Sequence, residues 1–306
     1  MGRYVAESLS QVMAAGYYTV VAYDDGSNGY LAFLEGLVRF LQCHLHEALI
    51  FFLLFFCIHV AKIHFFSYLC KRFMDFKIIH IEETDSTNRW LTTHGGGTPC
   101  VVWAEYQTAG RGCGTNSWES ERGKNLTFSV LLHPAELPAN RQFQISMQVS
   151  LALCEALGHH IGDLSIKWPN DIYWRNGKIA GILIENRLKG RIIRDSIVGI
   201  GLNVNQREFR SDAPNPVSLW QICEHETDRE QLLLDFLEAL KKNLGQDVRA
   251  QYLSMLYRCR GFHPYTDRDG AFMAEIADVE DDGHLVLRDE EARERRYAFK
   301  EVSFII

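Results

Sequence analysis

The sequence lacks both a cysteine pattern and an excess of positive charge. Its eight cysteines are scattered, with no CxxC pair and no closely spaced Cys/His quartet. This spacing argues against a structural zinc site and a disulfide scaffold, and it fits a reducing cytoplasm. The formal net charge of -7 is opposite to that of a protein holding nucleic acid through its overall charge. We therefore expect a cytoplasmic protein that binds no nucleic acid.

The N-terminal quarter also lacks an apolar run long enough to cross a bilayer. The uncharged run 49–61 covers about 13 residues, whereas a membrane-spanning helix needs about 20. It begins too late, after Glu35 and Glu47, to resemble a secretory signal. Three interpretations of residues 1–75 stay open: an upstream region translated only in the gene model, a membrane-associated helix, or an extra helical hairpin. We favour the first, because Met74 directly precedes what reads as a complete domain.

Residues 76–257 alternate between strand and helix patterns, which predicts an α/β or α+β domain. A short helix is expected from residue 89, after the cap-forming residues 84–88, and a longer one over 145–157, ending at Gly158. Asp228 and Gln231 resemble a capping box and predict a third helix that extends towards Tyr257. Strands are expected at 78–81, 100–106, 126–132, 165–168, 172–174, 179–185 and 192–202.

Two turn signals refine this outline. Asn176-Gly177 predicts a tight hairpin in which both residues take positive φ, with Lys178 at its mouth. After residue 257, short strands at 272–279, 285–287 and 296–304 are joined by acidic, glycine-bearing turns. These predict a small β barrel as a second domain, 258–306.

One guanidinium stands in a glycine-rich loop, Gly110-Arg111-Gly112, at the end of a strand. Glycine tolerates unusual dihedral angles and leaves room for a ligand, so backbone and guanidinium can approach an anion together. The loop matches neither the P-loop nor the dinucleotide fingerprint. Trp118, further along the loop, is an aromatic ring able to fold over a ligand. The loop predicts an anionic small molecule as ligand, with a plain surface loop as the alternative.

A second polar cluster follows about seventy residues later. Pro169 bends the chain next to Asn170 and Asp171, and the Asp171 carboxylate can hold Mg²⁺, the usual companion of nucleoside triphosphates. Lys178 can neutralise a carboxylate or phosphate, and Asn203 follows strand glycines where a backbone or ligand comes close. A capped turn, a solvated lysine and core packing are the structural alternatives. Together with the loop, the cluster suggests phosphate chemistry.

Five ordered motifs resemble the biotin protein ligase family. The resemblance covers roughly residues 76–306 and implies a catalytic α/β domain with a mixed sheet, related to class II synthetases and lipoate ligases, followed by a small SH3-like barrel. It implies that biotin and ATP with Mg²⁺ form biotinyl-5′-adenylate, and that biotin then passes to a lysine of a biotin carboxyl carrier protein. The motifs are Asp85-Ser86-Thr87-Asn88, residues 105–112, Lys167-Trp168-Pro169-Asn170-Asp171, Lys178-Ile179-Ala180-Gly181 and residues 199–204.

The resemblance also implies roles for individual residues. Arg111 and Lys178 would be catalytic, holding the activated carboxylate and phosphate oxygens. Ser86, Thr87 and Gln107 would read the ureido group of biotin, and Asp171 would bind the metal. The remaining biotin-binding positions would be Asn88, Gly110, Gly112, Cys113 and Gly181, and the ATP-binding positions would be Trp118, Asn170, Asp171 and Asn203.

The chain departs from the family pattern in two places. Many relatives carry a second arginine and a further glycine where this chain has Cys113 and Thr115, which puts tight retention of the adenylate in doubt. We expect Cys113 neither to ligate metal nor to act as nucleophile. Residues 1–75 show neither the basic face nor the helix spacing of the winged DNA-binding domain of bifunctional relatives, so we expect a ligase without repressor function.

Two other functions stay open. A lipoate or octanoate ligase on the same scaffold would need a longer, more apolar pocket, whereas Ser86, Thr87 and Gln107 suggest a polar reader. A membrane-associated binding protein would use residues 49–61 as its anchor, although we do not expect a membrane partner. The family includes monomers and dimers, and the sequence does not decide between them.

Overall fold

The computed structural model describes residues 76–306 except 115 and 211–213. The prediction for residues 1–75 therefore lies outside the described residues. Within these, no helix combines the length and apolar character needed to span a membrane. The helices are α3 Thr87–His94, η1 Ala139–Arg141, α4 Phe143–Leu157, α5 Leu219–Cys223, α6 Arg229–Asn243 and α7 Arg249–Ser254. The strands are β1 Lys77–Thr84, β2 Cys100–Gln107, β3 Leu126–Leu132, β4 Leu164–Lys167, β5 Asp171–Trp174, β6 Gly177–Lys189, β7 Ile192–Leu202, β8 His263–Asp267, β9 Gly270–Val279, β10 Leu285–Asp289, β11 Glu294–Tyr297 and β12 Ser303–Phe304.

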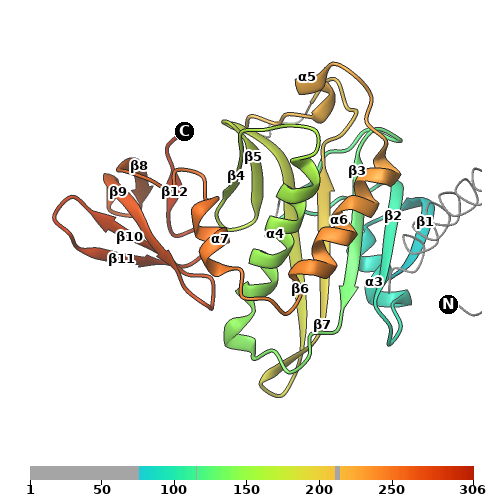
Figure 1. Ribbon diagram of the computed structural model, residues 1–306, viewed down its shortest axis with the longest axis horizontal. Helices are drawn as coiled ribbons and strands as arrows, with labels where there is room; N and C mark the ends of the chain where they lie inside the picture. Colours follow the sequence, from blue (N-terminus) through green and yellow to red (C-terminus); the bar gives the residue numbers. More distant parts are fainter. Residues whose placement is uncertain (1–75, 115, 211–213) are drawn as a thin grey trace, which may run out of the picture. The chain divides into compact units, whose positions relative to one another are not determined.

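A seven-stranded mixed sheet, in the order β1-β2-β3-β7-β6-β5-β4, forms the first layer. Strands β1 and β2 are parallel, and the other neighbouring pairs are antiparallel. Helices α4 and α6 lie side by side on one face (Figure 1), and α3 packs on the other face through Leu91. Every residue of β3 is buried, because this central strand has side chains covered on both faces. The predicted α/β class with a mixed sheet is confirmed.

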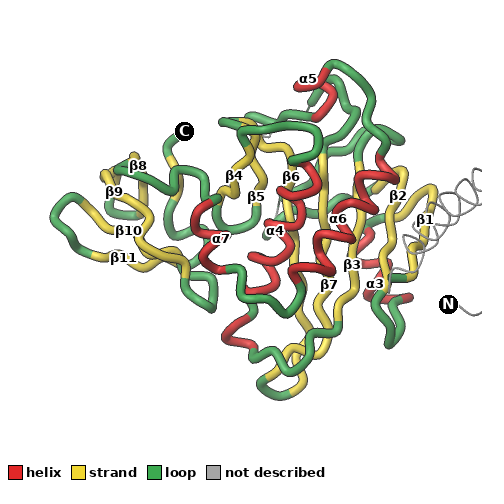
Figure 2. The backbone as a smooth tube through the Cα atoms, in the orientation of Figure 1, coloured by secondary structure: helices red, strands yellow, loops and turns green. Residues whose placement is uncertain are grey.

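Helix α4 is buried nearly all round, where the sequence pattern suggested a single apolar stripe. Twelve of its 15 residues are buried, including the polar Gln148 and Ser150. The helix packs on the sheet with α6 along one side and α7 along the other (Figure 2), so that protein surrounds most of it. Its end at Gly158 is as predicted.

The hairpin between β5 and β6 differs by one residue from the prediction. Trp174 pairs with Gly177, so the two turn residues are Arg175 and Asn176. Arg175 takes the positive φ of 51°, and Gly177 is not among the glycines with positive φ. Gly177 instead begins β6, where an added Cβ would lie 2.7 Å from Val217. The glycine serves close packing, and Lys178 lies one residue inside the strand.

The predicted helix from Asp228 to Tyr257 is two helices. Asp228 caps α6 by accepting hydrogen bonds from the backbone of Glu230 and Gln231, as expected. The Gln231 side chain bonds to Asp235, however, so the reciprocal half of the capping box is absent. The helix ends at Asn243 because Leu244 takes a non-helical ψ of 130° and Gly245 follows with a φ of 76°, and α7 starts only at Arg249.

The C-terminal residues form a five-stranded antiparallel sheet in the order β11-β10-β9-β8-β12. The predicted strands at 272–279 and 285–287 lie within β9 and β10. The predicted strand 296–304 is wrong, because a turn over 298–302 separates β11 from β12. Strand β8 was missed: it contains a proline and polar residues rather than an alternating apolar pattern. The boundary predicted at 257/258 stays a prediction.

Candidate active site

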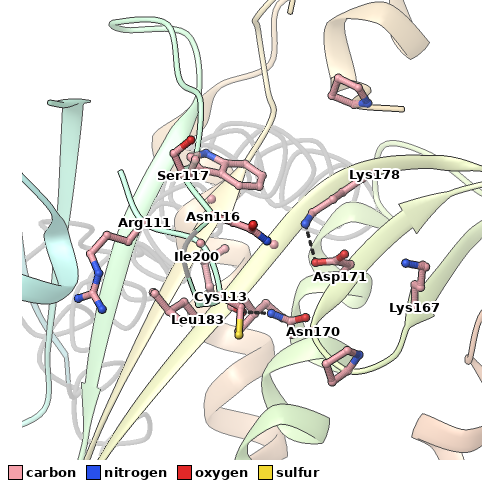
Figure 3. A pocket seen from close by; sticks show the side chains of 18 of the residues that line it. Arg111, Cys113, Asn116, Ser117, Lys167, Asn170, Asp171, Lys178, Leu183 and Ile200 are labelled. Atoms are coloured by element: carbon pink, nitrogen blue, oxygen red, sulfur yellow. Dashed lines mark hydrogen bonds and ion pairs between the residues drawn. The ribbon is translucent and has the colours of Figure 1, made fainter. Parts of the chain in front are cut away.

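A cavity of about 1190 Å³ opens on the side of the sheet that carries α3. It collects residues that lie far apart in the sequence, from the start of α3 and the end of β2. The glycine-rich loop and the first residues of β5 and β6 also line it (Figure 3). Of the predicted site residues, only Gly110 is absent from its wall. Those present are Ser86, Thr87, Asn88, Gln107, Arg111, Gly112, Cys113, Trp118, Asn170, Asp171, Lys178, Gly181 and Asn203.

A buried polar network forms one wall of this cavity. The backbone N–H and the hydroxyl of Thr87 donate to Gln107 Oε1, at 2.8 and 3.1 Å. The Ser129 hydroxyl lies 2.7 Å from Thr87 Oγ1 and 2.6 Å from Asn88 Oδ1. All but Gln107 are almost fully buried, so their hydrogen bonds fix the donors and acceptors in place. Such a wall is suited to a neutral polar group with both donors and acceptors.

Glu185 joins two of the predicted site residues. Its Oε1 accepts from Arg111 at 3.0 Å and its Oε2 accepts from Asn88 Nδ2 at 2.8 Å. The Arg111 guanidinium is consequently directed away from the Lys178 ammonium (Figure 3). The predicted cations share one cavity, but each already has a carboxylate partner.

Lys178 forms the other ion pair, with its Nζ 2.7 Å from Asp171 Oδ1. The two residues are on neighbouring strands, and Asp171 lies opposite Gly181. The nearby Lys167 ammonium lies over the rings of Tyr173 and Phe304, at 5.4 and 5.2 Å. Burial lowers the pKa of Lys167, and although Asp171 raises this pKa, Lys178 lowers it again. This end of the cavity concentrates positive charge around one carboxylate.

Trp118 covers a floor made of glycines. Gly181 and Gly201 lie opposite each other on β6 and β7. A Cβ added at Gly201 would lie 2.2 Å from the indole ring, and one added at Gly181 would lie 3.0 Å from it. The indole Nε1 is buried and has no hydrogen-bond partner among the described residues. A buried donor without an acceptor is costly, which favours a ligand oxygen or nitrogen at this position.

Comparison with known proteins places this chain in a family. Residues 81–203 match the Biotin/lipoate A/B protein ligase family. The chain is 30% identical over 227 residues to the biotin–[acetyl-CoA-carboxylase] ligase of Mycobacterium tuberculosis, covering 68% of this chain and 81% of that protein. The chain belongs to the biotin protein ligase family. The corresponding ligase of Paracoccus denitrificans is 35% identical over 162 residues, 50% of this chain and 67% of that protein.

The structural comparison agrees with this membership. The biotin protein ligase of Aquifex aeolicus, solved in complex with biotin and ATP, matches with a TM-score of 0.62 at 27% identity. The match covers 74% of this chain and 97% of that one. The described residues therefore have the biotin protein ligase fold, in which the mixed sheet is followed by the C-terminal sheet.

Within this family member, two predicted ATP-binding residues also support the backbone. Asn170 Nδ2 donates to Ile182 O at 2.6 Å, which ties the turn before β5 to β6. Asn203 Nδ2 donates to Val217 O at 3.1 Å, while its buried Oδ1 has no partner among the described residues. The Asn203 amide thus leaves an acceptor facing the interior. These backbone contacts are a structural reason for asparagine at positions 170 and 203, in addition to the predicted contact with ATP.

Sequence reasoning missed three contributors to the site: Glu185, Ser129 and the C-terminal turn 298–302. Glu185 and Ser129 belong to strands that read as scaffold, and only pairing across the sheet brings them to Asn88. The turn supplies Phe299 and Lys300 to the wall of the cavity. A charged or hydroxyl side chain in an otherwise apolar strand, as in residues 126–132 and 179–185, was the available signal.

Proposed function

We propose that the chain is an ATP-dependent biotin protein ligase. It joins biotin to AMP and then transfers biotin to a lysine of a biotin carboxyl carrier protein. The observation that carries this proposal is the convergence of five separate sequence motifs on one cavity of about 1190 Å³. The polar wall of Thr87, Gln107 and Asn88 suits the ureido ring of biotin, which offers a carbonyl acceptor and two N–H donors.

In the first step, a biotin carboxylate oxygen attacks the α-phosphorus of ATP and pyrophosphate leaves. Two anions have to meet, so the site must offset negative charge that accumulates in the transition state. Arg111 and Lys178 are the cations of the cavity in position to do so, once the substrate oxygens compete with Glu185 and Asp171 for them. Trp118 covers the glycine floor and restricts the entry of water.

The donor set fits Mg²⁺ held mainly by phosphates. Mg²⁺ in nucleotide sites commonly takes one or two carboxylates plus substrate phosphates and water. Asp171 lines the cavity and pairs with Lys178 through Oδ1, which leaves Oδ2 for a metal ion. Bound there, the ion would neutralise phosphate charge and assist the departure of pyrophosphate.

In the second step, the amine of the target lysine attacks the carbonyl carbon of the mixed anhydride and AMP leaves. The amine has to lose its proton first, because an ammonium has no lone pair. The cation-rich end of the cavity, with Lys167 and Lys178, favours the neutral form of an approaching amine by charge repulsion. The carrier protein and a cytoplasmic location belong to this proposal.

A lipoate or octanoate ligase is the alternative, since the matching family also includes lipoate ligases. A linear acyl chain offers no hydrogen-bonding groups to the buried polar wall of Thr87, Gln107 and Asn88. Burying such a chain there would leave the spare hydrogen-bonding groups of the wall, such as Gln107 Nε2, without a partner, which costs about 1–3 kcal/mol for each group. This cost favours biotin.

Isotope exchange between pyrophosphate and ATP tests the proposal with purified full-length protein. We expect exchange with biotin, at least 100-fold above that with lipoate or octanoate at equal concentration. A Thr87→Val variant, close in shape but without the hydroxyl, should raise the KM for biotin and leave that for ATP unchanged. Exchange with lipoate alone would overturn the assignment.

A further inference from the structure

A turn of the C-terminal sheet reaches the glycine-rich loop of the catalytic sheet. Residues 298–302 connect β11 to β12, and Lys300 within them lines the cavity. A Cβ added at Gly114 would lie 2.5 Å from Lys300 Nζ and 3.5 Å from its Cε. The ammonium therefore lies directly against the backbone of Gly114, three residues from Arg111. No motif in the sequence indicated this contact.

The turn is anchored so that Lys300 is held in place. The Phe299 ring meets Trp168 edge to face at 6.4 Å, and the Trp168 indole donates to Gly283 O at 2.9 Å. Glu301 closes the turn by accepting from the backbone N–H of Ala298 at 2.8 Å. Lys300 itself takes a φ of 71°, a left-handed conformation that costs a residue with a Cβ about 1–2 kcal/mol. A glycine would avoid this cost.

Lys300 differs from the cavity's other cations in its partners. Arg111 pairs with Glu185, Lys178 pairs with Asp171, and Lys167 lies between aromatic rings. For Lys300, no ion pair with a described carboxylate occurs, and the contact with the Phe299 ring at 5.7 Å leaves its ammonium donors unused. Its charge is available to an anion that enters between the loop and the turn.

We propose that Lys300 binds the β- and γ-phosphates of ATP and stabilises the pyrophosphate that leaves in the first step. The proposal rests on the proposed function, since a triphosphate must occupy the cavity. One bond forms between the biotin carboxylate oxygen and the α-phosphorus, and the bond to the β-phosphate bridging oxygen breaks. Lys300 transfers no proton. It offsets charge on the leaving group, while Arg111 and Lys178 act at the carboxylate and the α-phosphate.

The test compares Lys300→Gln, Lys300→Arg and Lys300→Gly in the full chain. Both neutral variants should raise the KM for ATP and the Kd of Mg·ATP about five- to tenfold, because a charge-assisted contact is lost. Lys300→Arg should stay within about twofold of wild type. The KM for biotin should not change in any of them. Lys300→Gly also relaxes the left-handed backbone, so its agreement with Lys300→Gln identifies charge as the cause.

Lys189→Gln is the matched control, since this exposed lysine lies at the opposite end of β6 from Lys178. An unchanged Kd for Mg·ATP in Lys300→Gln would overturn the proposal. A parallel rise in the KM for biotin would also do so, because it would indicate that Lys300 merely shapes the loop around Arg111. Calorimetry of Mg·ATP binding decides this even if the wild type shows no exchange with biotin, a result that would refute the proposed function separately.

Discussion

For Arg111, the sequence pattern and the folded chain indicate different partners. The pattern identifies a guanidinium available to an anion, and in the structure that guanidinium already holds Glu185 at 3.0 Å. Both side chains are more than a third exposed, so the pair contributes less than about 1 kcal/mol to stability. A substrate anion can therefore replace Glu185 at small cost. The Glu185 carboxylate takes the place of the substrate anion and keeps the Arg111 side chain at the cavity.

Replacing Arg111 by alanine should separate its chemical role from any structural one. We expect Arg111→Ala to lower kcat/KM for pyrophosphate exchange by about 100- to 1000-fold, because one cation that offsets transition-state charge is lost. The melting temperature should change by less than about 3 °C, given the weak ion pair. Arg122→Ala is the control, because Arg122 is in the same segment but pairs with Glu83 outside the cavity wall. Near-normal exchange by Arg111→Ala would contradict the role.

How far single residues can be predicted depends on sequence distance. Arg111 and Trp118 were readable because glycines and an aromatic ring stand within one loop. Glu185 and Lys300 were not, since Glu185 is 74 residues from Arg111 in the chain and only the sheet order unites them. Short motifs therefore predict site residues that are neighbours in the sequence. They do not predict residues that only strand pairing brings to the site.

Among the elements, the neighbouring strands β6 and β7 together form the glycine floor of the cavity. Gly181 and Gly201 lie opposite each other in register, and Gly199 lies two residues before Gly201 on the same face. The space over Gly199 holds Asn88, whose Oδ1 would lie 2.3 Å from an added Cβ, and the space over Gly201 holds Trp118. The sequence predicted a backbone or ligand close to these strand glycines, and in the structure the side chains of Asn88 and Trp118 lie there instead. The strands provide a floor without side chains, on which the site is built.

A methyl group at Gly201 should displace Trp118. We expect Gly201→Ala to raise the KM for ATP or biotin about tenfold, because a Cβ 2.2 Å from the indole cannot coexist with the present ring position. In a Trp118→Ala background the same change should cost much less, since the obstructed ring is gone. The double-mutant cycle is measured by pyrophosphate exchange, with circular dichroism to verify folding. Additive effects would refute contact between the ring and this strand.

Helix prediction failed over 228–257 because of a two-residue turn, in which Leu244 takes a ψ of 130° and Gly245 a φ of 76°. The apolar positions of α6 continue far enough to suggest a longer helix, but Gly245 adopts φ 76° and turns the chain before α7. Strong patterns such as residues 126–132 and 192–202 matched β3 and β7 because the run of β-forming residues ends where the strand ends. Where a glycine decides the outcome, pattern alone does not reveal whether it is tolerated inside the helix or ends it.

Gly245→Ala tests that explanation. The substitution should lower the free energy of unfolding by about 1–2 kcal/mol, because alanine in left-handed conformation is disfavoured by that amount. Steric contacts do not contribute, since an added Cβ meets no atom within 4 Å. Gly162→Ala is the control, because it is equally open but lacks positive φ. Urea denaturation measures both, and equal stability of the two variants would show that φ does not limit α6.

At the scale of the whole molecule, the C-terminal part of the chain supplies a wall of the cavity. The buried Trp168, in the turn before β5, donates to Gly283 of this sheet, and the backbone N–H of Tyr257 donates to Ile166 O at 2.8 Å. Because Lys300 and Phe299 line the cavity, loss of this sheet would open one wall. Stability of the C-terminal sheet therefore determines the integrity of the site.

The pH dependence of that stability should centre on Asp267 and Tyr297. Tyr297 Oη donates to Asp267 Oδ2 at 2.7 Å, and this hydrogen bond is the main reason why the pKa of Asp267 lies below 3.8. Burial, together with the same bond, raises the pKa of Tyr297 to about 12. The depressed carboxyl pKa stabilises the fold above pH 3.8, and this contribution is lost as pH falls through the folded pKa. The raised phenol pKa stabilises below pH 10 and is lost as pH rises towards 12.

Tyr297→Phe should therefore flatten both limbs of the stability profile. Its loss of unfolding free energy between about pH 5 and 3, and between about pH 10 and 12, should be smaller than that of wild type. Tyr265→Phe is the matched control, because burial raises the pKa of Tyr265 to about 12 but its buried hydroxyl has no partner among the described residues. It should alter the alkaline limb alone. If urea titrations across this pH range show equal acid limbs for Tyr297→Phe and wild type, the hydrogen bond to Asp267 does not control acid stability, and other carboxylates of the sheet must carry it.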